Sequence, residues 1–272
     1  MKKLLSLVFA LVLVVGVFSA NAESPKLESI LKSGKLVCAT DAAWAPFEYV
    51  GENGAVTGCD LEIAAYIAQQ LGVELEIVNV AFDTLPTYLA NDEADVVLAA
   101  MTITEERAES VDFSIPYTTA CQYIIVAEDD DSVSTIEDLA GKAIGVHLGT
   151  TGDFLVSDEI MLPEGVLYET GAVVQQYHFL TDACLALKNY ELQAIVCDTQ
   201  LAMNLCASNS GLKCFELVYA DGSKTDEQYG VAMKKGDAEF VAKVNEILAP
   251  IVEDGTIDGW IVKHSELSSN LK

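Results

Sequence analysis

The stretch DVVLAAMTITEERAESVDFSIPY, residues 95–117, decides how this chain is expected to fold. The largely apolar run 94–100 overlaps the start of this stretch and has the length of one buried strand. It leads directly into a helix start signal. Thr104 stands at the N-cap position, two glutamates fill the first turn, and Arg107 is the third helical residue. A buried strand followed by a helix is the repeating unit of an α/β fold with a largely parallel sheet.

The same alternation of strand and helix continues on both sides of this stretch. A Gly-Lys pair precedes an apolar strand and a polar turn at 33–40, and the pattern returns at 140–150, so each copy is expected to open one α/β unit. Two α/β lobes therefore fit the sequence better than one sheet. The further predicted strands are 74–80, 165–170 and 194–198, and the predicted helices are 60–72, 85–92, 181–190, 199–208, 238–255 and a short last one at Trp260.

Arg107 is the only arginine among 15 basic residues. A cation at a helix N-terminus opposes the helix dipole, so an anion is expected beside it. One interpretation is pairing with Glu105, Glu106 or a carboxylate across the lobe. The other is that Arg107 and the free N–H groups of the first turn bind a ligand carboxylate, which a guanidinium can grip through two parallel hydrogen bonds.

Other polar groups follow predicted strands, where ligands bind in open α/β sheets. Asp198 begins the helix after the strand 194–198, where it serves either as an N-cap or as the partner of a ligand ammonium. The segment GVHLGTTGDF, 145–154, supplies a Gly-Thr-Thr turn that is either an anion site or a plain connection. Asp41 and Trp44 follow the first strand, and Trp44 suits the core as well as a pocket wall.

Composition and charge limit the class of protein. The first 22 residues have two lysines, an apolar run and an Ala-Asn-Ala motif, which is the pattern of a secretory signal peptide, so we expect the mature chain to begin near Glu23 in a Gram-negative periplasm. No cysteine of a lipoprotein signal stands at the cleavage point. The formal charge is −27, and loss of the signal leaves 13 basic against 42 acidic residues, which argues against nucleic-acid binding.

The seven cysteines show no C-x-x-C spacing and their number is odd. Cys38, Cys121 and Cys197 lie in or beside apolar strands and are interpreted as small hydrophobic residues. Cys206 and Cys214 flank a short polar loop and form the one pair placed for a local bridge. The histidines are far apart and no metal, cofactor or nucleophile motif is present, so we expect no cofactor.

Several segments in this order resemble the type II extracytoplasmic solute-binding proteins of amino-acid ABC importers, the glutamine- and histidine-binding kind. The resemblance runs over the whole mature chain and implies two Rossmann-like lobes joined by two hinge strands, with no enzyme activity and no cofactor. The segments that carry it are ATDAAWAPFEY, GENGAVTGCDLEIAAYIAQQLG, DVVLAAMTITEERAESVDFSIPY, GVHLGTTG, AIVCDT and EQYGVAM.

The resemblance also implies boundaries and partners. The first lobe would contain 23–118 and 229–272, the second 119–228, and the hinge strands would lie near 117–121 and 225–229. The protein would be a monomer that closes on an amino acid and delivers it to a membrane permease, whose ATPase is another subunit.

For the ligand's head group, the resemblance implies that Arg107 grips the α-carboxylate, helped by Thr102 and by the backbone at Ala100 and Thr151. Asp198 would hold the α-ammonium. These five positions together would recognise the atoms that every α-amino acid shares.

For the ligand's side chain, the resemblance implies that Trp44 and Phe82 sandwich it and that Asp41 faces its end. His147 replaces the lysine of glutamine binders, so its part in selecting the side chain is open. Asp41 and the negative charge of the chain favour a polar or cationic side chain, and lysine, arginine, histidine, glutamine and cystine all stay open.

Two other functions fit the same pattern. Exported cyclohexadienyl dehydratases share the fold and the carboxylate-binding arginine, and here their general acid would have to be His147 or Asp41. An ammonium partner at Asp198 favours simple binding over that chemistry. A sensory domain is the third interpretation, but such domains are usually tethered, and the sequence has no second long apolar stretch.

Overall fold

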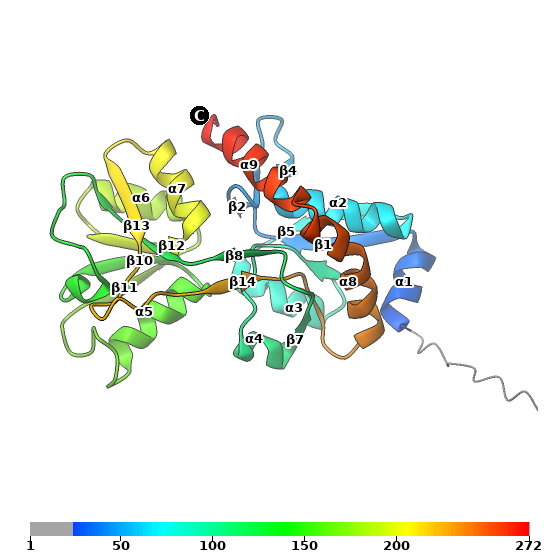
Figure 1. Cartoon of the computed structure of the whole chain (residues 1–272), viewed down its shortest axis with the longest axis horizontal. Coiled ribbons are helices and arrows are strands. Elements are labelled where there is room, and N and C mark those ends of the chain that lie inside the picture. Colours follow the sequence, from blue (N-terminus) through cyan, green and yellow to red (C-terminus); the bar gives the residue numbers. More distant parts are fainter. Residues whose placement is uncertain (1–23, 272) are drawn as a thin grey trace, which may run out of the picture.

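The computed structural model describes residues 24–271, which form two α/β lobes (Figure 1). The predicted signal peptide, 1–22, lies outside the described residues. In each central sheet four strands run in one direction and one strand, β15 or β9, runs against them, so the predicted largely parallel sheets are interrupted by one antiparallel strand. The first sheet has the order β5-β1-β6-β15-β7, with bounds β1 Lys35–Thr40, β5 Glu74–Asn79, β6 Val96–Val97, β7 Val111–Phe113 and β15 Ala232–Lys234.

The second sheet repeats this plan in the order β11-β10-β12-β9-β13. Its strands are β9 Gln122–Ala127, β10 Ala143–His147, β11 Val173–Tyr177, β12 Ala194–Asp198 and β13 Leu212–Glu216. The repeated Gly-Lys motif opens β1 in one sheet and β10 in the other. In both copies the glycine takes a positive φ, 72° at Gly34 and 73° at Gly141, which explains why glycine recurs there.

Helices cover the faces of both sheets. The first lobe has α1 Pro25–Ser33, α2 Cys59–Leu71, α3 Leu85–Ala90, α4 Glu105–Ser110, α8 Ala238–Glu253 and α9 Thr256–Ser269, with the 3₁₀ turn η1 Phe82–Thr84 and a small sheet of β2 Ala43–Trp44, β3 Glu48–Val50 and β4 Val56–Thr57. The second lobe has α5 Thr151–Met161, α6 Leu180–Lys188, α7 Thr199–Ser208 and the turn η2 Ile136–Leu139. No helix in the described part of the chain is long and apolar enough to span a membrane.

Two strands connect the lobes. β8 (Thr118–Ala120) and β14 (Glu227–Tyr229) pair antiparallel, with Glu227 opposite Ala120 and Tyr229 opposite Thr118. They run side by side through the middle of the molecule (Figure 1). The two lobes also touch through α7 and α9, where Asn204 Nδ2 donates to Ser268 Oγ at 2.7 Å. The chain therefore passes between the lobes through β8 and β14.

Two sequence predictions were wrong in detail. The segment 165–170 is a turn and not a strand, because the amides of Gly165 and Leu167 bond to carbonyls at the end of α5 and leave it no ladder partner. The last helix, predicted as short, runs over fourteen residues as α9.

Gly58, the N-cap residue of α2, has no room for a side chain. Its φ is 143°, and an added Cβ would lie 1.9 Å from the carbonyl oxygen of Phe47. We expect Gly58→Ala to lower the free energy of unfolding by more than about 3 kcal/mol, measured by urea denaturation. Gly54→Ala is the matched control, since Gly54 also has a positive φ but nothing within 4 Å; its cost should stay near 1 kcal/mol. Equal losses for the two variants would contradict the steric explanation.

Candidate functional site

A small cavity of about 10 Å³ lies between the lobes. Both lobes contribute to its wall, and the groups that line it are two aromatic rings, one guanidinium, one carboxylate and several small polar residues. They are Trp44, Phe82, Ala100, Thr102, Arg107, Thr150, Thr151 and Asp198. Seven of the nine residues predicted for the ligand site line this cavity, and the other two, Asp41 and His147, form the wall beside the aromatic rings.

Arg107 reaches the cavity from the start of α4. Its backbone N–H donates to Thr104 Oγ1 at 3.1 Å, so Thr104 is the N-cap that the sequence predicted. The guanidinium leaves the helix and donates to the carbonyl oxygens of Thr102, at 2.9 Å, and of Gly149 in the other lobe, at 3.1 Å. It also lies over the Phe82 ring, 5.4 Å from the ring centre.

Among the described residues no carboxylate lies within ion-pair distance of Arg107, so pairing with Glu105 or Glu106 does not occur. Burial lowers the pKa of Arg107, while the charges of Asp198 and Glu227 act in the opposite direction. An arginine starts from so high a pKa that it keeps its charge at neutral pH. The cavity thus has a cation on one side that is held by two carbonyl groups and the Phe82 ring, without a carboxylate partner among the described residues.

Asp198 occupies the N-cap position of α7, but its side chain makes no cap hydrogen bond. Its carboxylate instead accepts from Gln122 Nε2, at 2.7 Å, and from the Tyr229 hydroxyl. Burial and the neighbouring Glu227 raise the pKa of Asp198 to about 7 against the effect of these hydrogen bonds. A cation beside Asp198 would relieve this cost, because it favours the ionised form. The interpretation of Asp198 as an N-cap therefore does not explain why its carboxylate is buried at this position.

Glu227 is a site residue that sequence reasoning missed. It lies on β14, and its carboxylate accepts from the hydroxyls of Thr102 at 2.8 Å and Thr151 at 2.9 Å, and from Gln122 Nε2 at 2.8 Å. Thr102 and Thr151 belong to different lobes, so Glu227 joins both lobes beneath the cavity. The amide orientation of Gln122 follows from its neighbours, since only its NH₂ group can face the two carboxylates of Asp198 and Glu227.

The aromatic wall also contains His147. Its ring centre lies 5.3 Å from that of Trp44 and 6.1 Å from that of Phe82, and its Nε2 is 3.5 Å from Asp41 Oδ2. Burial lowers the pKa of His147 to about 4 and raises that of Asp41 to about 6. At neutral pH the wall therefore has one ionised carboxylate and a neutral imidazole. Asp41 is fixed by the backbone N–H of Phe82, which donates to it at 3.1 Å.

Ala100 shows the strain expected of a binding loop. Its φ is 47°, in the left-handed region that alanine rarely adopts. Asp60, at the start of α2, holds this conformation: its carboxylate accepts from the Ala100 N–H at 2.7 Å and from the Tyr117 hydroxyl at 2.9 Å. The turned backbone at Ala100 lines the cavity. Cys59, the residue before Asp60, is fully buried.

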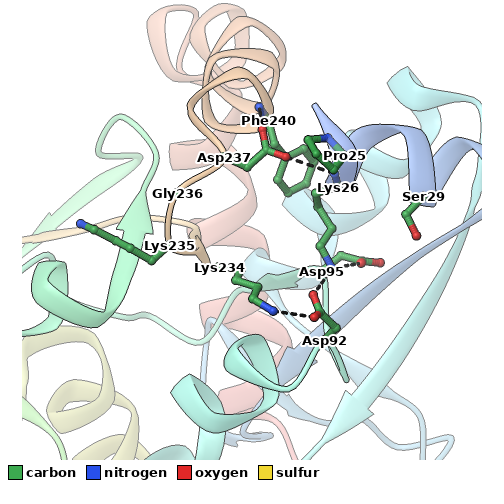
Figure 2. Close-up of a pocket in the computed structure, with 10 residues that line it drawn as sticks. All are labelled: Pro25, Lys26, Ser29, Asp92, Asp95, Lys234, Lys235, Gly236, Asp237 and Phe240. Carbon is green, nitrogen blue, oxygen red and sulfur yellow. Dashed lines mark hydrogen bonds and ion pairs between the residues drawn. The ribbon is translucent and has the colours of Figure 1, made fainter. Parts of the chain in front are cut away.

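A wider pocket lies on the far side of the first lobe, between α1, α8 and β15 (Figure 2). Its lysines are already paired: Lys26 contacts Asp92 at 3.0 Å and Asp95 at 3.1 Å, and Lys234 also contacts Asp92. These ion pairs hold α1 to the sheet, and the pocket draws its lining from one lobe only. Among the described residues, no group of three or more His, Cys, Asp or Glu side chains is arranged to hold a metal ion.

The family model of the bacterial extracellular solute-binding proteins, family 3, matches residues 36–265. The chain belongs to this family. The arginine-binding extracellular protein ArtP of Bacillus subtilis is 30% identical over 258 residues, which cover 95% of this chain and 96% of ArtP. The L-cystine-binding protein TcyJ of Escherichia coli K12 is 27% identical over 252 residues, covering 92% and 90% of the two chains.

A solved structure agrees with this assignment. The arginine-bound form of truncated ArgBP from T. maritima superposes with a TM-score of 0.73 and 38% identity, covering 82% of this chain and 99% of that one. The two lobes and their two connecting strands are thus the type II fold of the family 3 solute-binding proteins, as the sequence predicted.

Gln122 and Glu227, which join the residues around the cavity through hydrogen bonds, are only weakly indicated by the sequence. Gln122 is a polar residue at the start of the apolar strand QYIIVA, and Glu227 stands in EQYGVAM, a segment that the family resemblance already marked. Their 105-residue separation hides the hydrogen bond between them from any local pattern. A buried polar side chain in an apolar strand is the clue that indicates Gln122.

Proposed function

We propose that this chain captures an α-amino acid between its lobes and delivers it to the permease of an ABC importer. One observation carries the proposal: the only arginine and a buried, uncapped aspartate, Arg107 and Asp198, line the same small cavity from different lobes. The guanidinium suits the α-carboxylate, and the aspartate suits the α-ammonium. A ligand that binds both groups favours the closed arrangement of the lobes.

The side chain of the ligand would point toward Trp44, Phe82, His147 and Asp41. An ionised Asp41 beside a neutral His147 favours a cationic side chain, and relatives named for arginine support this choice. We therefore propose L-arginine or a similar cationic amino acid. Cystine, which names another relative, is the main competitor.

The lobe boundaries and the setting of the protein are part of the same proposal. The first lobe would contain 23–118 and 229–272 and the second 119–228, so that β8 and β14 act as the hinge. The protein would work as a periplasmic monomer after removal of its signal peptide, without a nucleic-acid partner. Its formal charge of −27 supports the last point.

A thermal-shift panel tests the function. The purified mature protein would be heated with each of the twenty amino acids, ornithine, cystine and prephenate, and positive results would be measured by calorimetry. A ligand at a hundred times its Kd stabilises the folded state by about 2.7 kcal/mol. Arginine should give the largest shift, and no shift with any amino acid would overturn the proposal.

The dehydratase interpretation predicts a different result in that panel. It requires a response to prephenate without a response to amino acids, followed by product formation. The relatives named above are binding proteins and not enzymes, which supports the binding function. Asp198 also has no evident part in dehydration, whereas it is suited to an ammonium ligand.

Asp41→Asn tests the selection of the side chain. The variant keeps an oxygen that can accept from the Phe82 N–H but loses the charge. We expect the affinity for arginine to fall about 10- to 100-fold and the affinity for any neutral amino acid to stay within about threefold, measured by calorimetry. Asp83→Asn is the matched control, because Asp83 is an exposed neighbouring carboxylate. An equal loss for charged and neutral ligands would contradict a selective role for Asp41.

The affinity should also depend on pH. The pKa of Asp198 is about 7, and only its ionised form suits an ammonium, so binding should release a proton below that pH. The Kd should therefore rise as the pH falls, by on the order of 10- to 100-fold between pH 8 and pH 5. Asp41, with a pKa of about 6, would add to this for cationic ligands, so the Asp41→Asn variant isolates the contribution of Asp198. A Kd that stays constant in that variant would contradict the assignment.

A further inference from the structure

Four cysteines lie on neighbouring elements of the second lobe. Cys184 on α6 and Cys197 on β12 are both 1% exposed, so solvent oxidants do not reach them. Cys206 on α7 and Cys214 on β13 are partly exposed and pack against the same core cluster, and each thiol shifts the pKa of the other. The last pair is therefore the one in which two sulfurs are both adjacent and accessible.

The elements that carry this pair are fixed relative to each other. α7 packs on β13, and the loop 209–211 joins them. β13 in turn pairs with β9 along its whole length, where Cys214 lies opposite Ile125. Because α7 and β13 already pack against each other, a bond between the two sulfurs would close only the short loop 206–214.

We propose that Cys206 and Cys214 form an intramolecular disulfide when the chain meets a disulfide oxidant such as glutathione disulfide. Disulfides persist outside the cytosol, where the family to which the chain belongs is found. This inference does not depend on the ligand of the binding site. It adds a covalent connection at the C-terminal end of α7, the helix that begins directly after Asp198.

The chemistry balances without any other reactant. The neighbouring Cys206 thiol lowers the pKa of Cys214, so Cys214 supplies the thiolate that attacks one sulfur of glutathione disulfide. A mixed disulfide forms and one glutathione leaves as thiolate. Cys206 then loses its proton and attacks the Cys214 sulfur, which releases the second glutathione. The protein loses two electrons and two protons, and the oxidant is reduced to two thiols.

The stability effect follows from the short loop. A disulfide that closes a loop of about ten residues restricts the unfolded chain, so the oxidised protein should melt about 5 °C above the reduced protein. The variant Cys206→Ser/Cys214→Ser should lose this response to dithiothreitol. Cys121→Ser should keep it, because Cys121, the other partly exposed cysteine, contacts Thr199 and Glu216 instead.

Peptide mapping gives the direct test. The folded full-length mature protein is treated with glutathione disulfide, its free thiols are alkylated, and it is digested with trypsin without reduction. Cleavage after Lys213 separates the two cysteines, so the bond should appear as peptide 189–213 joined to peptide 214–224, and fragmentation should place it at Cys206 rather than Cys197. Alkylation of both thiols, or a bond from either to another cysteine, would overturn the proposal.

Discussion

Replacing Arg107 by alanine should weaken amino-acid binding by about three orders of magnitude and leave the protein folded. The guanidinium is held by the carbonyl oxygens of Thr102 and Gly149 and by the face of Phe82, and it has no ion pair among the described residues. A partly buried arginine that pairs with a ligand carboxylate contributes about 3–5 kcal/mol when the partner would otherwise stay unpaired. Calorimetry with arginine measures the loss.

Two controls separate this effect from general damage. Arg107→Lys keeps the charge but loses the planar pair of donors, so it should recover only part of the affinity. Glu105→Gln changes an exposed charge on the same helix and should bind as the wild type does. The ligand-free melting temperature of Arg107→Ala should stay within a few degrees of wild type. If Arg107→Ala bound arginine with near wild-type affinity, Arg107 would not be part of the binding site.

Asp198→Asn should produce the second largest effect, a loss of about 100- to 1,000-fold in affinity without a loss of stability. Its carboxylate makes no cap hydrogen bond to α7, so removing the charge does not unravel the helix. Because the pKa of Asp198 is raised to about 7 in the folded protein, ionisation of its carboxylate lowers the free energy of unfolding. Above about pH 7, the asparagine variant should therefore melt at the same temperature as wild type or higher.

A lower melting temperature with unchanged affinity would assign a different role to Asp198. If Asp198 acted mainly as an N-cap, its replacement would lower the melting temperature and spare the affinity. Thr150→Ala gives the matched comparison, because the Thr150 side chain does cap α5 by accepting from the Asp153 N–H at 3.4 Å. That variant should lose stability by about 1 kcal/mol.

Local sequence patterns predicted much of the fold because they reflect local causes. The Thr104 cap, the strand 194–198 and the helix 199–208 follow from short-range periodicity and from cap residues, and the structure has all three. The prediction for the segment 165–170 failed because Leu167 is buried by folding back on α5, which periodicity does not distinguish from a strand.

The site was predictable to the extent that single side chains revealed it. Arg107 was indicated because it is the only arginine and because its charge at a helix N-terminus opposes the helix dipole. The family resemblance indicated the other site residues. The sequence did not indicate that the hydroxyls of Thr102 and Thr151 would bond to Glu227, because this contact depends on how the two lobes meet. The left-handed backbone of Ala100 was also hidden, since Asp60, forty residues away, imposes it.

Calorimetry with head-group analogues of arginine tests the central claim most directly. Agmatine lacks the α-carboxylate, and 5-guanidinopentanoic acid lacks the α-ammonium, while both keep the side chain. The wild-type protein should bind L-arginine and bind each analogue at least about 100-fold more weakly, because each leaves Arg107 or Asp198 without its partner. If agmatine bound as tightly as arginine, Arg107 would not be a carboxylate clamp, and the proposed mode of amino-acid recognition would be wrong.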